Sequence, residues 1–271
     1  MAAVAQTNFI FGGGNHPWDA SRFQASDDRV RGGVSVSFLD VGPSPSDPGR
    51  TAATFHGHLN TTALGGAGFA SQRTADPFSA DLTGVSGLVA EIVVPTSVAA
   101  SEGGAACSSP PSSSSSAACC GADGKSGKTF TVTLKNDILP PSPDGREQST
   151  VSWEYGFCVV PEQGGATDQA KTRRVEMPLS DFKATYRGRE VKDATLDLAN
   201  IKRITFMMRS FFGEQDGDFN LTMNYLAASG PVKVAAGAAL PSSDAASADE
   251  AQIPVTKERR GVLGWLYSWV R

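Results

Sequence analysis

Apolar and polar residues alternate along several short stretches of this chain. The apolar members of the clearest stretches are Val34, Val36 and Phe38, then Phe130, Val132 and Leu134, then Val151, Trp153, Tyr155 and Phe157. A period of two places these side chains on one face of a β-strand. Residues 52–59, the Gly-rich stretch 65–72 and the apolar run 88–94 predict further strands. Roughly ten short strands without sustained helical periodicity predict an all-β fold, an antiparallel β-sandwich.

The stretch from Ile201 to Leu226 has the highest density of large apolar residues. An apolar run, 204–212, is followed by the polar segment 213–218 and then by a second run in which apolar residues alternate with polar ones. Because Asp-Gly pairs favour turns, this pattern predicts a hairpin with a buried first strand and a half-buried second strand. Arg209 lies within the first run. An unpaired charge there would be costly, so we expect a partner or a wet groove beside it.

Composition divides the chain into three parts. The sandwich is expected over residues 1–226, interrupted at about 95–127 by a Ser/Ala/Gly/Pro-rich insertion that cannot bury enough apolar surface to order and is therefore predicted to be a disordered loop. Residues 227–256 are predicted to be a flexible linker. Residues 257–271 form an amphipathic C-terminal segment with a basic flank, in which Trp265, Leu266 and Trp269 would dock to a membrane surface or a partner. The alternative of a tail that folds back on the sandwich carries equal weight.

Charge and cysteine content exclude some classes of function. The net charge of −4 gives no polyanion-binding signature. The first residues predict neither a signal peptide nor a mitochondrial presequence, and no run approaches the ~18 apolar residues of a membrane span. We therefore expect a soluble intracellular protein. The four cysteines include no CxxC pair, so the spacing supports neither a zinc site nor a disulfide framework.

Candidate chemistry is sparse. Residues 122–129 nearly match a phosphate-binding loop, but Thr129 opens a strand where that mechanism needs a helix, so nucleotide binding is not expected. His56 and His58 share the outward face of a strand and have no evident third ligand, which disfavours a metal site. The acidic residues of 214–218 are better explained by turn geometry than by calcium binding. No catalytic constellation is found, and we expect neither enzymatic activity nor a cofactor or metal.

Arginines supply the remaining candidates. Arg31 precedes two glycines, Arg187 and Arg189 flank Gly188, and a partner could approach the backbone closely at both places. The partner-binding candidates are Arg31, Arg187, Arg189, Arg209 and Glu214. The alternative for each arginine is an ordinary ion pair with a neighbouring carboxylate such as Asp28, Glu190 or Glu214.

Four segments of the sequence resemble the complex I intermediate-associated protein 30 family. They are Asp28–Ser35 (DRVRGGVS), Leu64–Ser71 (LGGAGFAS), Val151–Glu154 (VSWE) and the region from TYRGREV to the end of IKRITFMMRSFFGEQDGDFNLTMNYL. The resemblance implies a jelly roll of the galactose-binding type. It also implies a non-enzymatic, chaperone-like assembly factor that binds unfolded or partly assembled intermediates of mitochondrial NADH:ubiquinone oxidoreductase, or other assembly factors, peripherally on the matrix side.

Two alternatives stay open at this point. The sandwich could be a carbohydrate-binding module, which would need exposed aromatic residues on a concave face, whereas Trp153 alternates with the core-facing residues. The chain could also be a cytosolic paralogue that acts as a protein-binding scaffold, because no presequence is predicted.

Overall fold

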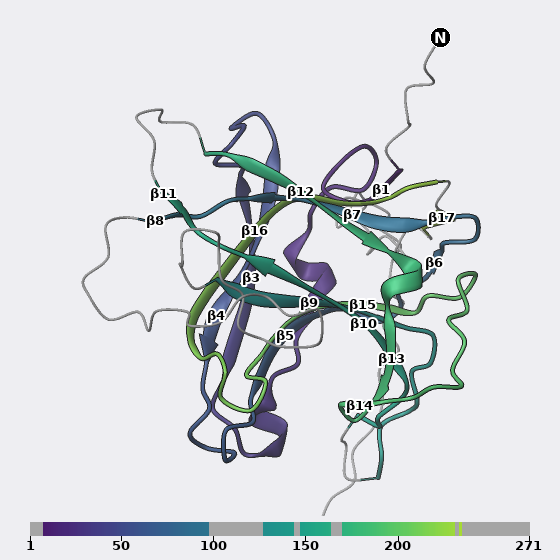
Figure 1. The fold of residues 1–271 in the computed structure, drawn as a ribbon. Coiled ribbons are helices and arrows are strands. Elements are labelled where there is room, and N and C mark those ends of the chain that lie inside the picture. Colours follow the sequence, from purple (N-terminus) through teal and green to yellow (C-terminus); the bar gives the residue numbers. More distant parts are fainter. Residues whose placement is uncertain (1–7, 98–126, 144–146, 164–169, 231–232, 235–271) are drawn as a thin grey trace, which may run out of the picture. The chain divides into compact units, whose positions relative to one another are not determined.

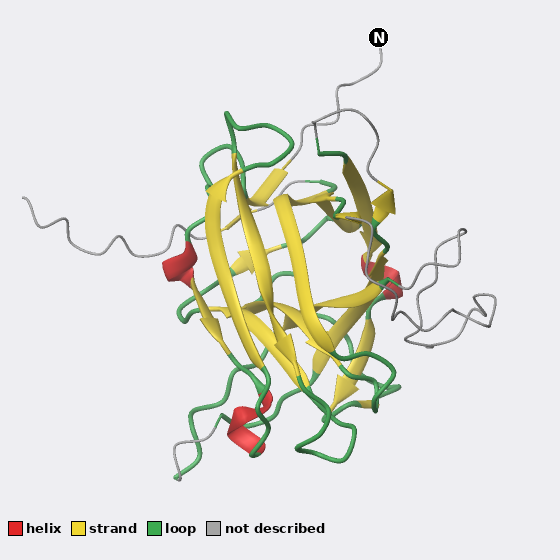
Figure 2. Cartoon of the chain, turned by 90° about the vertical axis from the view of Figure 1, so that its left-hand side faces the viewer, coloured by secondary structure: helices red, strands yellow, loops and turns green. Residues whose placement is uncertain are grey.

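The computed structural model describes residues 8–97, 127–143, 147–163, 170–230 and 233–234. They belong to one compact unit, 1–237, and the second unit, 238–271, contains none of them. Two packed antiparallel sheets form this unit, which confirms the predicted β-sandwich (Figure 1). Helical structure in the described ranges is limited to three short 3-10 turns at the margins of the strands (Figure 2), namely η1 (Ala20–Arg22), η2 (Asp28–Arg31) and η3 (Leu179–Asp181).

The first sheet has six strands. They are β1 (Asn8–Phe11), β3 (Val36–Pro43), β4 (Thr51–Leu59), β7 (Gly87–Val93), β12 (Thr172–Pro178) and β16 (Gly217–Ala228). Their order is β12-β7-β16-β4-β3, and β1 also pairs with β16. Strand β16 is therefore the central strand of this sheet.

The second sheet has seven strands, in the order β14-β13-β10-β9-β15-β5-β2. They are β2 (Phe23–Ala25), β5 (Phe69–Thr74), β9 (Lys128–Lys135), β10 (Ser152–Val159), β13 (Lys183–Tyr186), β14 (Arg189–Glu190) and β15 (Arg203–Arg209). Two small pairs complete the described strands: β8 (Thr96–Ser97) with β11 (Glu162–Gln163), and β6 (Ala80–Asp81) with β17 (Lys233–Val234).

The core lies between the two sheets and follows the predicted alternation. Phe130 and Leu134 on β9 are 1% and 0% exposed. Across the core, Phe55 on β4 meets Phe130 with ring centroids 6.3 Å apart. Trp153 on β10 is 6% exposed and packs in the same cluster, as its position in the alternation predicted. Strands such as β9 and β10 thus turn their apolar residues to the core, whereas β7 is buried on both faces. The chemistry of the outward faces decides what the sandwich can bind.

The predicted hairpin at 204–225 is wrong. Both strands form, but β15 pairs with β9 and β5 in the seven-stranded sheet, whereas β16 pairs with β4 and β7 in the six-stranded sheet. The polar segment between them therefore connects the two sheets across the edge of the core. Alternation identifies a strand and its buried face, but it does not identify the neighbouring strand, and long-range pairing decides that.

Two strands lie at the boundaries that composition predicted. Strand β16 continues to Ala228, beyond the boundary expected at 226, and β8 lies within the segment expected to be a loop. The rest of that insertion, most of the expected linker, and Trp265, Leu266 and Trp269 lie outside the described residues, so those expectations remain predictions. No helix in the described part of the chain is long and apolar enough to span a membrane.

Cys158 is the one cysteine among the described residues. It is disulfide-bonded, a bond that the spacing of the cysteines did not indicate. The other three cysteines lie outside the described residues. Spacing failed here because it is informative about metal motifs and cannot predict which distant segments meet in three dimensions.

Candidate partner-binding surface

The predicted binding residues fall into two groups. Arg31 ends η2, and its guanidinium lies 5.6 Å from the ring centroid of Phe69. Phe69 is directly opposite Arg209 in the β5–β15 register, and Glu214 lies in the loop that follows β15. These residues gather at one end of the seven-stranded sheet. Arg187 and Arg189 lie away from them at the β13–β14 turn, three strands from β15.

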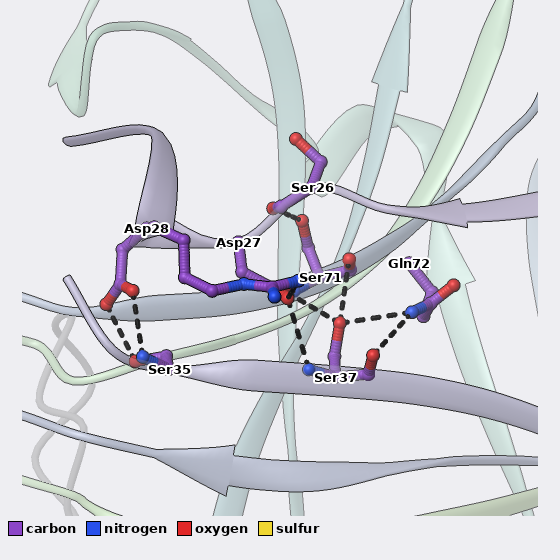
Figure 3. Close-up of polar contacts among 8 residues, drawn as sticks. Ser26, Asp27, Asp28, Ser35, Ser37, Ser71 and Gln72 are labelled. Atoms are coloured by element: carbon purple, nitrogen blue, oxygen red, sulfur yellow. Dashed lines mark hydrogen bonds and ion pairs between the residues drawn. The ribbon is translucent and has the colours of Figure 1, made fainter. Parts of the chain in front are cut away.

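A buried carboxylate pair positions η2 at this end (Figure 3). Asp28 is 0% exposed and accepts hydrogen bonds from the backbone N–H and hydroxyl of Ser35 and from the backbone N–H of Phe69. Asp27 accepts from the backbone N–H and hydroxyl of Ser37 and from the backbone N–H of Ser71. The pair therefore fastens β3 of one sheet to β5 of the other. Because buried polar groups with full sets of partners stabilise a fold, we assign this cluster a structural role.

Two glycines of the same segments are required by close packing. A Cβ atom at Gly33 would lie 2.3 Å from the Asp28 carboxyl group, and one at Gly68 would lie 2.5 Å from the backbone oxygen of Asn60. Real Cβ contacts are never that short, so larger residues would displace the carboxylate or the loop. Close packing within the fold thus requires glycine at these two positions of the Gly-rich motifs.

The loop after β15 exposes the aromatic side chain of Phe212 to solvent, and the backbone of this loop is strained. Phe211 and Phe212 have positive φ angles of 47° and 61°, a region that non-glycine residues seldom occupy. Phe212 is 87% exposed, whereas the guanidinium of Arg209 lies 5.0 Å from the Phe211 ring centroid. Gln215 fixes the loop, because its side chain donates to the backbone oxygens of Thr129 and Arg209 and accepts from the backbone N–H of Thr129. We call the Phe211–Phe212 turn, η2 and the 65–68 segment the rim.

The outer face of the seven-stranded sheet, the side away from the core, is polar. Strand register places a continuous row of residues across it: Gln24, Arg73, Thr205, Thr133, Glu154 and Lys183. Thr131 and Gly156 lie in the next row, also side by side. The alternation that buries the apolar residues of these strands thus collects their hydroxyl and charged groups on one surface.

Arg209 has the partner that its burial required. Its guanidinium lies 2.7 Å from a carboxylate oxygen of Glu154, and the two side chains are 29% and 12% exposed. Because β9 lies between β15 and β10, this ion pair crosses above β9. The sequence predicted that Arg209 needs a partner but not which one. Glu154 could have been found from its outward position beside Trp153 in the alternating stretch.

A second charged cluster lies farther along the same face. Arg203 is 2% exposed and forms ion pairs with Asp76, at 2.8 Å, and with Glu147. Arg73 reaches the same two carboxylates, at 3.6 Å and 3.3 Å. Burial lowers the pKa of the adjacent Lys135, with neighbouring Glu147 opposing that shift. Sequence reasoning did not find this cluster, because its members come from separate strands and two separate loops.

Several polar atoms of this face lack hydrogen-bond partners. In the described ranges, five buried side-chain nitrogen or oxygen atoms have none: the Nε atoms of Arg73, Arg203 and Arg209 and the hydroxyls of Thr131 and Thr133. All five residues lie on the outer face of β5, β15 and β9. Native proteins rarely leave such atoms unpaired, so their concentration on one face distinguishes this surface from the rest of the described chain.

The outer face of the six-stranded sheet is different. His56 and His58 point outward and pair with Asp40 and Asp218, at 2.8 Å and 2.7 Å, beside a shallow depression that is also lined by Phe38. The predicted outward position of the histidines is therefore confirmed. No group of three potential metal ligands gathers within the described ranges.

Comparison with known proteins gives the context of this surface. A family model described as complex I intermediate-associated protein 30 matches residues 11–94 and 122–223. An uncharacterized protein of Schizosaccharomyces pombe is 32% identical over 213 residues, which cover 78% of this chain and 79% of that protein.

Among solved structures, a family 11 carbohydrate-binding module of a cellulosomal cellulase of Clostridium thermocellum is similar, with a TM-score of 0.45 and 13% identity, over 84% of this chain and 97% of the module. A family 30 carbohydrate-binding module aligns with a TM-score of 0.39 and 13% identity, over 73% of this chain and 92% of the module. The family model spans the strands of both main sheets, the buried carboxylate pair and the rim. The chain therefore belongs to the complex I intermediate-associated protein 30 family.

Proposed function

We propose that this protein is a non-enzymatic, chaperone-like assembly factor that binds intermediates of respiratory complex I, NADH:ubiquinone oxidoreductase, during their assembly in mitochondria. The observation that carries the proposal is the family match over both main sheets. A site that only binds is consistent with the outer face, where ion pairs and unpaired hydrogen-bonding groups gather and no nucleophile–base pair stands out. The partners are complex I intermediates or other assembly factors.

The rim supplies the contact surface in this proposal. Aromatic residues and arginines dominate the binding energy of protein interfaces, and strained backbone accumulates at functional sites. Phe212 meets both conditions, because it is 87% exposed on a left-handed turn that Gln215 holds in place. Arg31, Arg209 and Glu214 would surround it in the interface, and Arg187 and Arg189 would contribute at the other edge of the sheet.

Native gels of mitochondrial membranes from cells that lack the protein test the assignment. We expect loss of complete complex I and accumulation of a partly assembled form. Wild-type protein should restore the complex, whereas Phe212→Asn should not, because asparagine tolerates the left-handed backbone but removes the aromatic contact. Phe38→Asn is the matched control, since Phe38 is also exposed, at 53%, but lies on the other sheet. Normal complex I in the deleted cells would overturn the assignment and favour a scaffold role outside mitochondria.

We further propose that the C-terminal segment contacts a membrane surface or a partner through Trp265, Leu266 and Trp269. Two tryptophans beside a basic flank are typical of interfacial anchors. Removing the chain after Arg260 should abolish flotation with anionic lipid vesicles while leaving the sandwich folded. Continued flotation of the shortened protein would contradict this part of the proposal.

A further inference from the structure

The unpaired atoms of the outer face are predominantly donors. An arginine Nε can only donate a hydrogen bond, and a threonine hydroxyl can donate one and accept others. The carboxylates that could satisfy them are already engaged, since Glu154 binds Arg209, and Asp76 and Glu147 bind Arg203. A molecule that satisfies this face must therefore bring acceptor oxygens of its own.

The charge of the face points to an anionic molecule. From β5 across to β10, its cationic groups are Arg73, Arg203, Arg209 and the half-buried Lys135, and the carboxylates among them are Asp76, Glu147 and Glu154. Four cationic groups thus face three anionic ones, while the whole chain carries a net charge of −4. The local excess of cations is opposite in sign to the charge of the protein, and it favours a carboxylate-bearing ligand.

The Arg209–Glu154 ion pair passes over the strand that holds the two unpaired hydroxyls. It crosses above β9, the strand that carries Thr131 and Thr133, which are 1% and 3% exposed. Both ends of the pair are partly accessible, at 29% and 12%. A competing carboxylate can therefore approach Arg209 from solvent and take the place of Glu154.

Gly156 leaves room for a ligand beside Thr131. It is exposed and lies directly opposite Thr131 in the β10–β9 register. A Cβ atom at this position would meet its nearest neighbours only at 3.9 Å, so packing does not require glycine here. Glycine inside a strand often marks a place where another chain comes close. Without a side chain at this position, a ligand can approach the strand next to Thr131 more closely.

We propose that the outer face of the seven-stranded sheet binds an acidic peptide segment. A ligand carboxylate displaces Glu154 from Arg209, and further ligand oxygens accept from Thr131, Thr133 and the free Nε–H groups. The intramolecular ion pair closes the face when no ligand is present. This inference rests on the proposed function only in taking the segment to belong to a partner protein.

Fluorescence anisotropy with the full-length protein tests the proposal. The probe is a labelled peptide in which glutamate alternates with serine, and the control peptide has glutamine at every glutamate. We expect Arg209→Met to weaken binding of the acidic peptide by about tenfold or more, and Glu154→Gln to strengthen it by about tenfold, because the competing carboxylate is gone. Gly156→Leu should block binding sterically.

Arg174→Met is the matched control for Arg209→Met. Arg174 forms an ion pair with Glu176 at 3.3 Å on the other sheet, so its loss changes the net charge equally without touching the outer face. Equal binding of the two peptides, equal effects of the two arginine variants, or no binding by the wild type would overturn the inference.

The two proposals fail in different ways. If the protein binds the acidic peptide but cells that lack the protein have normal complex I, the assembly role is refuted and the peptide site on the outer face is supported. A complex I defect that is fully rescued by Arg209→Met and Gly156→Leu would refute the site and leave the assembly role.

Discussion

Replacing Thr131 and Thr133 by valine tests whether their hydroxyls on the outer face lack hydrogen-bond partners in the free protein. Each hydroxyl is buried without a partner, so folding removes it from water with no compensating bond. Valine keeps the branched shape and replaces the hydroxyl by a methyl group. The substitutions should therefore stabilise the free protein. Elsewhere a buried threonine hydroxyl usually has a hydrogen-bond partner, and its replacement by valine is then destabilising.

The size of the gain follows from transfer energies. An uncompensated buried hydroxyl costs about 1–3 kcal/mol in protein mutational data. Taking the lower end for each site, the double variant should gain about 2 kcal/mol. For a domain of this size, that corresponds to a rise in the melting temperature of about 4–8 °C. The two sites lie on the same strand, so we expect their effects to be roughly but not strictly additive.

Thr74→Val is the matched control with the opposite sign. Thr74 is 1% exposed in the same sheet, but its hydroxyl oxygen accepts a hydrogen bond from the backbone N–H of Ile204 at 3.2 Å. Valine there leaves a buried N–H unpaired and should destabilise by about 1–3 kcal/mol. Urea unfolding followed by tryptophan fluorescence measures all three variants. If Thr131→Val and Thr133→Val destabilised the protein as Thr74→Val does, the two hydroxyls would have hydrogen-bond partners in the free protein. The proposal that they bind a ligand on the outer face would then be refuted.

Three further predictions concern the buried charges. Asp28→Ala removes the acceptor of three hydrogen bonds and should destabilise by about 3 kcal/mol in urea unfolding, whereas an effect below about 1 kcal/mol would show that the carboxylate is dispensable. Asp76→Asn combined with Glu147→Gln leaves the Arg203 guanidinium buried without a counter-charge and should cost about 3–5 kcal/mol, more than the two single changes together. Burial lowers the pKa of Lys135 in the folded protein below its ordinary value of 10.5. Between these two pKa values the unfolded chain binds more protons than the folded protein. The free energy of unfolding therefore increases as the pH rises through that window. Lys135→Met should flatten that rise in unfolding curves compared at neutral and alkaline pH, and an unchanged slope would contradict it.

The sandwich was predictable because most of its long strands alternate apolar and polar residues, and β7, which is buried on both faces, is a mostly apolar run. The alternation at Phe130, Val132 and Leu134 identifies both a strand and its buried side, and the structure agrees. The same rule places Thr131, Thr133 and Glu154 outward, so the composition of the outer face was also available from the sequence. Pairing was not, since the prediction of a hairpin between β15 and β16 relied on proximity in sequence and on an Asp-Gly turn.

The parts of the site that could not be predicted depend on contacts between distant segments. Glu154 meets Arg209 across an intervening strand, and Arg203 meets a loop carboxylate, Glu147, which is far away in the sequence. The left-handed turn at Phe211 and Phe212 had no local signal, because aromatic residues normally avoid that conformation. Surrounding hydrogen bonds impose it, and no window of the sequence contains them.

The position of β16 has a consequence for how the protein is made. Among the described residues it is the last long strand to be synthesised, yet β4 and β7 both pair with it at the middle of the six-stranded sheet. Until it emerges, the nascent chain carries two separate half-sheets, β3–β4 and β7–β12, each with an open inner edge. Unpaired strand edges recruit other chains, so the nascent protein depends on protection from aggregation until β16 has been synthesised.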